Sequence, residues 1–208
     1  MKLAIFDLDG TLVNSLADIA EATNYAMRIL GFPEHELSEF NYLVGDGVAK
    51  LIERALPAEN QDKFDEALSL YNNYYNKNYT VKTYIYDGIE KMLNTLKEKG
   101  FELAVASNKT HEFTENVISY YFGDELFSEG NPVKPSPAIV DNIMDKLNIS
   151  KENTVMIGDT CIDIKTGKNA GIKTIGCLWG FRTLEELVNA GSDYIADKPL
   201  DIVKYLCE

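Results

Sequence analysis

Two carboxylates stand two positions apart directly after an apolar run at the start of the chain. The run Lys2–Phe6 has the character of a buried strand, and Asp7 and Asp9 follow it within an Asp-Leu-Asp-Gly-Thr segment. Two like charges repel each other, and burial penalises their ionisation further. The pair therefore indicates either a cation beside it or a reaction in which one carboxyl attacks while the other moves a proton. Ordinary turn chemistry of Asp and Gly is the alternative.

Polar side chains also follow the later strand-like segments of the sequence. They are Ser107 and Asn108 after residues 102–106, Lys134 after a weak strand near 126–127, and Asp159 and Asp163 after residues 154–157. In a parallel sheet the carboxyl ends of the strands lie at the same edge, where ligands bind. We therefore expect these side chains to gather with the N-terminal carboxylates.

Each of these residues also has an ordinary structural explanation. Ser107 and Asn108 are good helix caps, and Lys134 is of a type that usually lies in solvent. Thr160 with Asp163 fits a capping box, in which the acidic side chain binds backbone. All of these explanations would have to coincide at one edge of one sheet, and this favours a functional site there.

The apolar spacing predicts the elements that must position these side chains. We expect helices at about 16–30, 47–56 and 61–79, then helices at about 88–99, 110–120, 136–147 and 162–169 that alternate with strands at 102–106, near 126–127, at 154–157 and at 173–177. Alternation of this kind predicts a parallel sheet with right-handed crossovers. The predicted fold class is α/β: a Rossmann-like parallel sheet core of residues 1–14 and 82–208, with an all-helical domain inserted at residues 15–81.

The composition of the chain limits the classes of partner that it is expected to bind. The chain has 208 residues, and 33 acidic against 20 basic side chains give a net charge of -13, which disfavours binding to nucleic acid or to an anionic membrane. Its three cysteines have no metal-ligand spacing, and we expect them to be reduced thiols of a cytoplasmic protein. No stretch has the length of a membrane span. A monomer or a homodimer is expected.

The four motifs, taken in order along the chain, resemble those of the haloacid dehalogenase superfamily of hydrolases, and specifically of its phosphatases. They are Asp7-x-Asp9-Gly10-Thr11, Ser107, Lys134 and Gly158-Asp159-x-x-x-Asp163. The helical insert after the first motif is similar to the cap domain of that family. The resemblance covers the whole chain, and it implies a phosphatase.

The resemblance also implies a role for each motif residue. Asp7 would be the nucleophile that forms an aspartyl-phosphate, and Asp9 the general acid and later the general base. Ser107 and Asn108 would bind the phosphoryl group, and Lys134 would neutralise charge between nucleophile and phosphate.

A metal ion belongs to the same set of expectations. The resemblance implies that Asp7, the backbone carbonyl of Asp9, and Asp159 bind Mg²⁺, with Asp163 closing or supporting that shell. The chemistry of the donors agrees, because an all-oxygen set without His or Cys suits Mg²⁺ better than zinc.

The insert offers a clue to the substrate. Gly45, Asp46 and Gly47 resemble the substrate-specificity loop of phosphoglycolate phosphatases, although a plain turn between helices is the alternative. The expected substrate is a small phosphorylated metabolite similar to 2-phosphoglycolate. Alternatives are an inorganic pyrophosphatase or nucleotidase, a sugar-phosphate mutase, and a non-catalytic protein that binds phosphometabolites.

Overall fold

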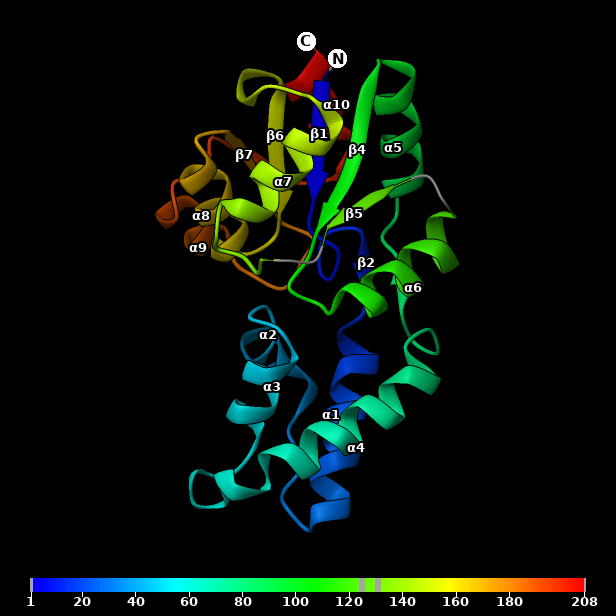
Figure 1. Ribbon diagram of the computed structural model, residues 1–208, viewed down its shortest axis with the longest axis vertical. Helices are drawn as coiled ribbons and strands as arrows, with labels where there is room; N and C mark the ends of the chain where they lie inside the picture. The colour runs from blue at the N-terminus through cyan, green and yellow to red at the C-terminus, as the bar shows by residue number, and fades with distance from the viewer. Residues whose placement is uncertain (1, 124–125, 130–131, 208) are drawn as a thin grey trace. The chain divides into compact units, whose positions relative to one another are not determined.

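The computed structural model describes residues 2–123, 126–129 and 132–207. The chain folds into two compact units, one made of Met1–Val13 with Ile85–Glu208 and the other of Asn14–Tyr84. Figure 1 shows the elements of both. Each unit is described by itself below.

The first unit contains a parallel sheet, for which the described residues give six strands in the order β5-β4-β1-β6-β7-β8. The strands are β1 (Lys2–Phe6), β4 (Phe101–Ala106), β5 (Phe127–Glu129), β6 (Thr154–Gly158), β7 (Lys173–Cys177) and β8 (Tyr194–Ala196). In the centre, Phe6 of β1 pairs with Val105 of β4 and with Ile157 of β6. The residues that follow these three strands therefore emerge side by side.

Helices alternate with the strands of this unit, as the sequence predicts. They are α5 (Ile89–Glu98), α6 (His111–Phe122), α7 (Ala138–Leu147), α8 (Cys161–Ala170), α9 (Leu184–Asn189) and α10 (Pro199–Cys207), with a 3-10 turn, η3, at Lys151–Asn153. The α/β fold class is confirmed. The sequence did not predict β8, α9 or α10, because a strand of three residues and helices of six and nine residues carry too little periodicity.

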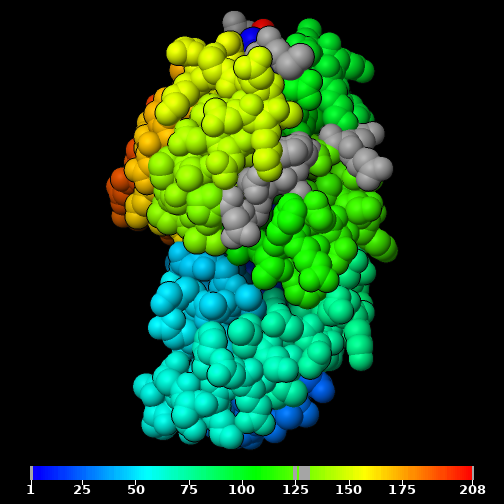
Figure 2. Space-filling view, viewed as in Figure 1, coloured from blue at the N-terminus to red at the C-terminus, as the bar shows by residue number. Residues whose placement is uncertain are grey.

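The core of the first unit explains why its strands read as continuous apolar runs. Leu3 and Ile5 of β1 pack in one cluster with Ile143 of α7 and Ala170 of α8. The alternate residues of β1, such as Phe6, are also fully buried, so both faces of the sheet are covered. Figure 2 shows the green and yellow segments of this unit, α6 and α7 among them, forming the surface on the side that faces the viewer.

The second unit is helical. Its helices are α1 (Leu16–Leu30), α2 (Phe40–Leu43), α3 (Val48–Ala55) and α4 (Phe64–Asn78), with 3-10 turns η1 (Leu37–Glu39) and η2 (Ala58–Lys63). Helices α1 and α4 pack along each other, and the rings of Tyr25 and Tyr74 stack with centroids 4.5 Å apart. Helix α1 ends at Gly31, whose φ of 76° is a left-handed conformation that glycine adopts without strain.

Two short strands mark the ends of the insert. Strand β2 (Val13–Asn14) pairs with β3 (Tyr84–Ile85), so the segments that enter and leave the second unit lie beside each other. Nearby, the buried carboxylate of Asp18 accepts hydrogen bonds from the backbone amides of Lys82 and Thr83 at 2.8–3.0 Å. These bonds join the first turn of α1 to the last residues of the insert.

Candidate active site

Asp7 lies at the carboxyl end of the central strand and is tied to a buried lysine. Its backbone amide donates to the Ile157 carbonyl at 2.8 Å, which continues the pairing of β1 with β6. Its Oδ1 atom lies 2.6 Å from the Nζ atom of Lys134, and the same Nζ lies 2.6 Å from Oδ1 of Asp163. One ammonium thus bridges two carboxylates that stand 156 residues apart in the chain, at positions 7 and 163.

Asp163 has two functions in the local structure. It stands in the first turn of α8, and its Oδ2 atom accepts hydrogen bonds from the amide of Thr160 at 3.0 Å and from the Thr160 hydroxyl at 2.8 Å. The capping box expected from the sequence is therefore present. Since Oδ1 is bound to Lys134, the same carboxylate both caps the helix and takes part in the buried charge cluster.

Asp159 is fully buried and is held by two donors that the sequence did not reveal. The hydroxyl of Thr11 donates to its Oδ1 atom at 3.0 Å, and the backbone amide of Phe181 donates to its Oδ2 atom at 2.8 Å. A Cβ atom added at Gly10 or at Gly180 would overlap the Asp159 carboxylate. The glycines of the Asp-Gly-Thr and Trp-Gly-Phe segments therefore allow two loops to close around this side chain.

Asp7, Asp159 and Asp163 form a candidate metal site. Each offers a carboxylate oxygen, these oxygens lie within 4.8 Å of one another, and all three residues are buried. Three oxygen donors of negative charge with a single lysine suit a hard divalent cation such as Mg²⁺. The residues present therefore fit the ion.

The pKa values of the buried carboxylates indicate that this cluster needs more positive charge than Lys134 alone provides. Burial raises the pKa of Asp7 well above its ordinary value, and repulsion from Asp163 and Asp159 adds to the rise while Lys134 opposes it. Burial and repulsion from Asp163 raise the pKa of Asp159 to about 7. Burial would lower the pKa of Lys134, but the attraction of Asp163 and Asp7 outweighs it and raises that pKa. A bound cation would relieve the remaining repulsion among the carboxylates.

The Asp9 side chain has a cationic partner outside this triad. The loop after β1 is tight, since the amides of Leu12 and Val13 both donate to the Leu8 carbonyl at 3.0 and 3.1 Å. The Asp9 carboxylate pairs with Lys109, whose Nζ atom lies 2.8 Å from Oδ2. The sequence did not reveal this partner, although Lys109 stands directly after two predicted site residues. The two carboxylates of the first motif therefore have different cationic partners.

Ser107 and Asn108 lie where β4 ends, as predicted. The Asn108 side chain accepts a hydrogen bond from the amide of Lys134 at 2.7 Å and donates to the carbonyl of Lys134 at 3.1 Å. Asn108 thus fixes the backbone of the bridging lysine. Ser107 is buried, and its Oγ atom accepts from the amide of Lys109 at 3.2 Å. A phosphate contact by either residue stays a prediction.

The predicted specificity loop lies in the second unit, between α2 and α3. Gly45 and Gly47 have φ values of 119° and 86°, and Gly47 is the residue that precedes the first turn of α3. Oδ2 of Asp46 lies 2.5 Å from Nη2 of Arg54, and Nη1 of Arg54 donates to the Leu43 carbonyl at 3.1 Å. The loop is therefore a braced turn between helices, and its role toward a substrate stays a prediction.

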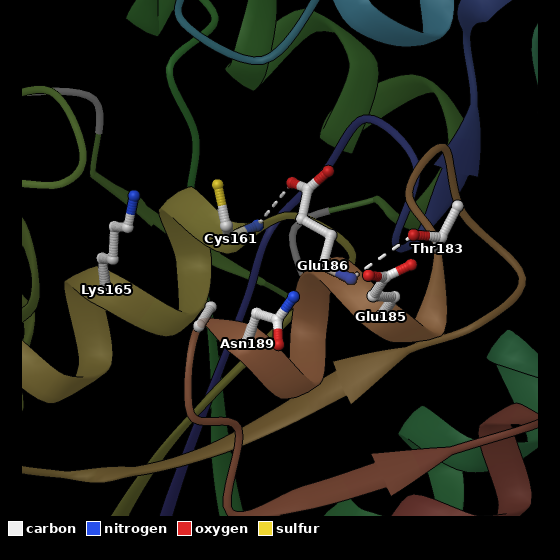
Figure 3. A pocket seen from close by; sticks show the side chains of 7 residues that line it. Cys161, Lys165, Thr183, Glu185, Glu186 and Asn189 are labelled. Atoms are coloured by element: carbon white, nitrogen blue, oxygen red, sulfur yellow. Dashed lines mark hydrogen bonds between the residues drawn. The ribbon is translucent and has the colours of Figure 1, made fainter.

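A pocket of about 440 Å³ lies between α8 and α9, and none of the predicted site residues lines it. Figure 3 shows the Glu186 side chain reaching from α9 to the backbone amide of Cys161, which donates to it at 3.2 Å. Its lining contains two glutamates, Glu185 and Glu186, and one lysine, Lys165. This charge balance disfavours an anion there, so the strand ends remain the candidate active site.

No helix within residues 2–123, 126–129 and 132–207 is both long and apolar enough to cross a membrane.

Comparison with known proteins connects the site to a family. A model of the haloacid dehalogenase-like hydrolases matches residues 4–177. A phosphoglycolate phosphatase of Aquifex aeolicus is 36% identical, over 99% of this chain and 97% of that protein. One of Vibrio cholerae is 31% identical, over 95% of this chain and 93% of that protein. The crystal structure of a predicted phosphoglycolate phosphatase from Haemophilus somnus has a TM-score of 0.89 and 27% identity, with 99% of this chain and 97% of that chain covered.

Proposed function

Since the chain belongs to the haloacid dehalogenase-like hydrolases and is a phosphatase of that family, we propose that it hydrolyses a small phosphomonoester in a Mg²⁺-dependent reaction with an aspartyl-phosphate intermediate. The observation that carries the proposal is the Lys134 ammonium held 2.6 Å from Asp7 beside two further buried carboxylates. A carboxylate can attack a phosphoryl dianion only where positive charge offsets the repulsion. Lys134 supplies part of that charge from within the protein.

In the first step, an oxygen of the Asp7 carboxylate attacks phosphorus and the bond between phosphorus and the ester oxygen breaks. Asp9 gives its proton to the departing alkoxide, so the alcohol leaves neutral. In the second step, water attacks the phosphorus of the aspartyl-phosphate, a water proton passes to the Asp9 carboxylate, and the bond to the Asp7 oxygen breaks. General acid–base groups of this kind contribute roughly 10²–10⁴-fold to the rate.

Residues of this chain would hold both the phosphoryl group and the metal ion during these steps. The Ser107 hydroxyl and the Asn108 amide are proposed to bind phosphoryl oxygens, and Asn108 also fixes the backbone of Lys134. Asp7, Asp159, Asp163 and the backbone carbonyl of Asp9 would hold Mg²⁺. When bound, the ion would supply the remaining neutralisation of charge around the transferred phosphoryl group.

The proposed substrate is 2-phosphoglycolate or a metabolite of similar size. Support comes from the relatives that carry the name phosphoglycolate phosphatase over nearly the full length of this chain. We propose that Gly45, Asp46 and Gly47 take part in substrate choice. The short, braced form of this loop would give it a fixed backbone with which to recognise a small anion.

A substrate panel tests the proposal. The purified chain with Mg²⁺ should release phosphate faster from 2-phosphoglycolate than from pyrophosphate, nucleoside monophosphates or hexose phosphates. Acid quenching during turnover of ³²P-labelled substrate should leave label on the protein, and Asp7→Asn should abolish both label and turnover. A wild-type level of turnover in Asp7→Asn would contradict the covalent intermediate, and preference for pyrophosphate would contradict the substrate.

A further inference from the structure

Asp9 and Lys109 form an enclosed ion pair at the sheet edge. Nζ of Lys109 lies 2.8 Å from Oδ2 of Asp9, and the side chains are 6% and 19% exposed. Lysine is seldom so deeply covered unless a charged partner compensates for its lost hydration. The partner here is the carboxylate to which the proposed function assigns both proton transfers.

The backbone of Lys109 is fixed from two sides. Its amide donates to the Ser107 Oγ atom at 3.2 Å, where β4 has just ended. Its carbonyl accepts from the hydroxyl of Thr114, a buried residue of α6, at 3.4 Å. The lysine therefore approaches Asp9 from an anchored main chain, and the carboxylate it binds follows the neighbouring strand, β1. The arrangement can fix the orientation of Asp9 relative to the sheet edge.

We propose that Lys109 is a positioning residue for the acid–base step: its ammonium binds Oδ2 of Asp9, so that Oδ1 carries the proton that passes to the leaving-group oxygen. The inference rests on the proposed function, because it needs Asp9 to protonate the leaving group. A displacement of a catalytic group by about 1 Å can slow a reaction about 10²-fold. Loss of the ion pair should therefore slow the first step strongly for a leaving group that needs protonation and only slightly for one that does not.

Substrates with different leaving groups distinguish a positioning role of Lys109 from a role in substrate binding. An alkyl phosphate releases a strongly basic alkoxide and depends on protonation, whereas p-nitrophenyl phosphate releases a stable anion and depends on it little. The ratio kcat/KM reports on steps up to the first irreversible one, here formation of the aspartyl-phosphate. Comparing kcat/KM for the two substrates thus measures protonation of the leaving group without the later attack of water.

The experiment uses the full chain with saturating Mg²⁺ and compares 2-phosphoglycolate with p-nitrophenyl phosphate. Lys109→Met should lower kcat/KM for 2-phosphoglycolate at least about tenfold more than for p-nitrophenyl phosphate, as expected for part of an acid–base contribution. Lys109→Arg, which keeps the charge, should recover most of the loss. Lys91→Met, at an exposed lysine of α5, is the matched control and should leave both values unchanged.

The variant Asp9→Asn shows how much more kcat/KM falls for 2-phosphoglycolate than for p-nitrophenyl phosphate when the acid itself is removed. If Asp9→Asn discriminates between the substrates and Lys109→Met lowers both equally, for instance through KM, then Lys109 binds the substrate anion and the positioning role is overturned. If Asp9→Asn itself fails to discriminate, the acid role of Asp9 in the proposed function is overturned together with it. In the double variant Asp9→Asn/Lys109→Met, the loss should be close to that of Asp9→Asn alone, because both changes remove one function.

Discussion

The ammonium of Lys134 lies 2.6 Å from Oδ1 of Asp7, and protein encloses both side chains. The lysine reaches this position because Asn108 binds its backbone amide and carbonyl. Burial alone would favour the neutral forms of both groups. Asp163 and Asp7 keep Lys134 charged, and Lys134 in turn opposes the rise that burial and Asp163 cause in the pKa of Asp7, so the ammonium is a source of the positive charge that phosphoryl transfer requires.

Removing the lysine should destabilise the chain. In Lys134→Met, the carboxylates of Asp7 and Asp163 lose their shared cation and remain buried. Breaking a buried pair in this way costs about 3–5 kcal/mol. Urea unfolding without metal should show a loss of that size, while the exposed control Lys91→Met should change stability by less than about 0.5 kcal/mol. A loss below about 1 kcal/mol for Lys134→Met would show that the pair contributes little.

Mg²⁺ should stabilise the wild-type chain against heat and urea. At a hundred times the dissociation constant, binding to the folded state alone adds about 2.7 kcal/mol. Asp7→Asn should lose most of this gain. Without metal the variant should be at least as stable as the wild type, because one of three neighbouring buried charges is gone. Melting curves with Mg²⁺ and with EDTA test both statements, with exposed Asp197→Asn as the control; identical wild-type curves would argue against the metal site.

A single methyl group at Gly180 should disturb the same site. A Cβ atom there would overlap the Asp159 side chain and the Gly10 carbonyl. Gly180→Ala should therefore push Asp159 away from the amide of Phe181 and weaken Mg²⁺ binding about 10–100-fold, the usual effect of disturbing groups around a metal site. Calorimetric titration with Mg²⁺ measures the change.

Gly171→Ala is the matched control for this glycine. Gly171 ends α8 with a φ of 73°, and a Cβ atom there would meet nothing within 4 Å. Alanine in a left-handed conformation costs roughly 1–2 kcal/mol of stability. Metal affinity should stay unchanged in this variant. An equal loss of affinity in both variants would indicate general destabilisation instead of displacement of Asp159.

Much of this arrangement follows from the sequence, because one simple rule governs it. Charged residues that follow apolar strands gather at one edge of a parallel sheet, so Asp7, Lys134 and Asp159 could be predicted to meet. The Thr160 and Asp163 pair also has a recognisable capping pattern, and the structure adds the bond from Asp163 to Lys134. Local spacing and strand order suffice for these features.

The unpredicted contacts depend on information that spacing does not carry. Phe181 binds Asp159 through its backbone amide, and every residue except proline has that group, so no residue type identifies it. The pairing of Lys109 with Asp9 joins two strand ends, and it depends on the side-chain conformations of both residues. The three residues of strand β8 are identified as a strand mainly by their parallel pairing with β7, which the sequence does not show.

The last prediction concerns the edge of the sheet, where Asp193 joins the start of β8 to β7. Its Oδ2 atom accepts from the amide and the hydroxyl of Thr174 at 2.8 Å, and its Oδ1 atom lies 2.8 Å from Nζ of Lys168. Burial would raise the pKa of Asp193, but the hydrogen bonds from Lys168 and Thr174 outweigh it and lower that pKa below the ordinary value of 3.8. The folded state therefore favours the charged carboxylate.

This lowered pKa fixes the sign of the pH dependence. Above pH 3.8, the pKa of the unfolded chain, the group stabilises the folded state fully; as pH falls below that value the unfolded chain takes up a proton first and the contribution is lost. Asp193→Asn should therefore be less stable than the wild type by an amount that is constant above about pH 5 and shrinks below pH 3.8. Urea unfolding across this range, with Asp197→Asn as a charge-matched control, measures the difference; a gap that widens on acidification would contradict the assignment.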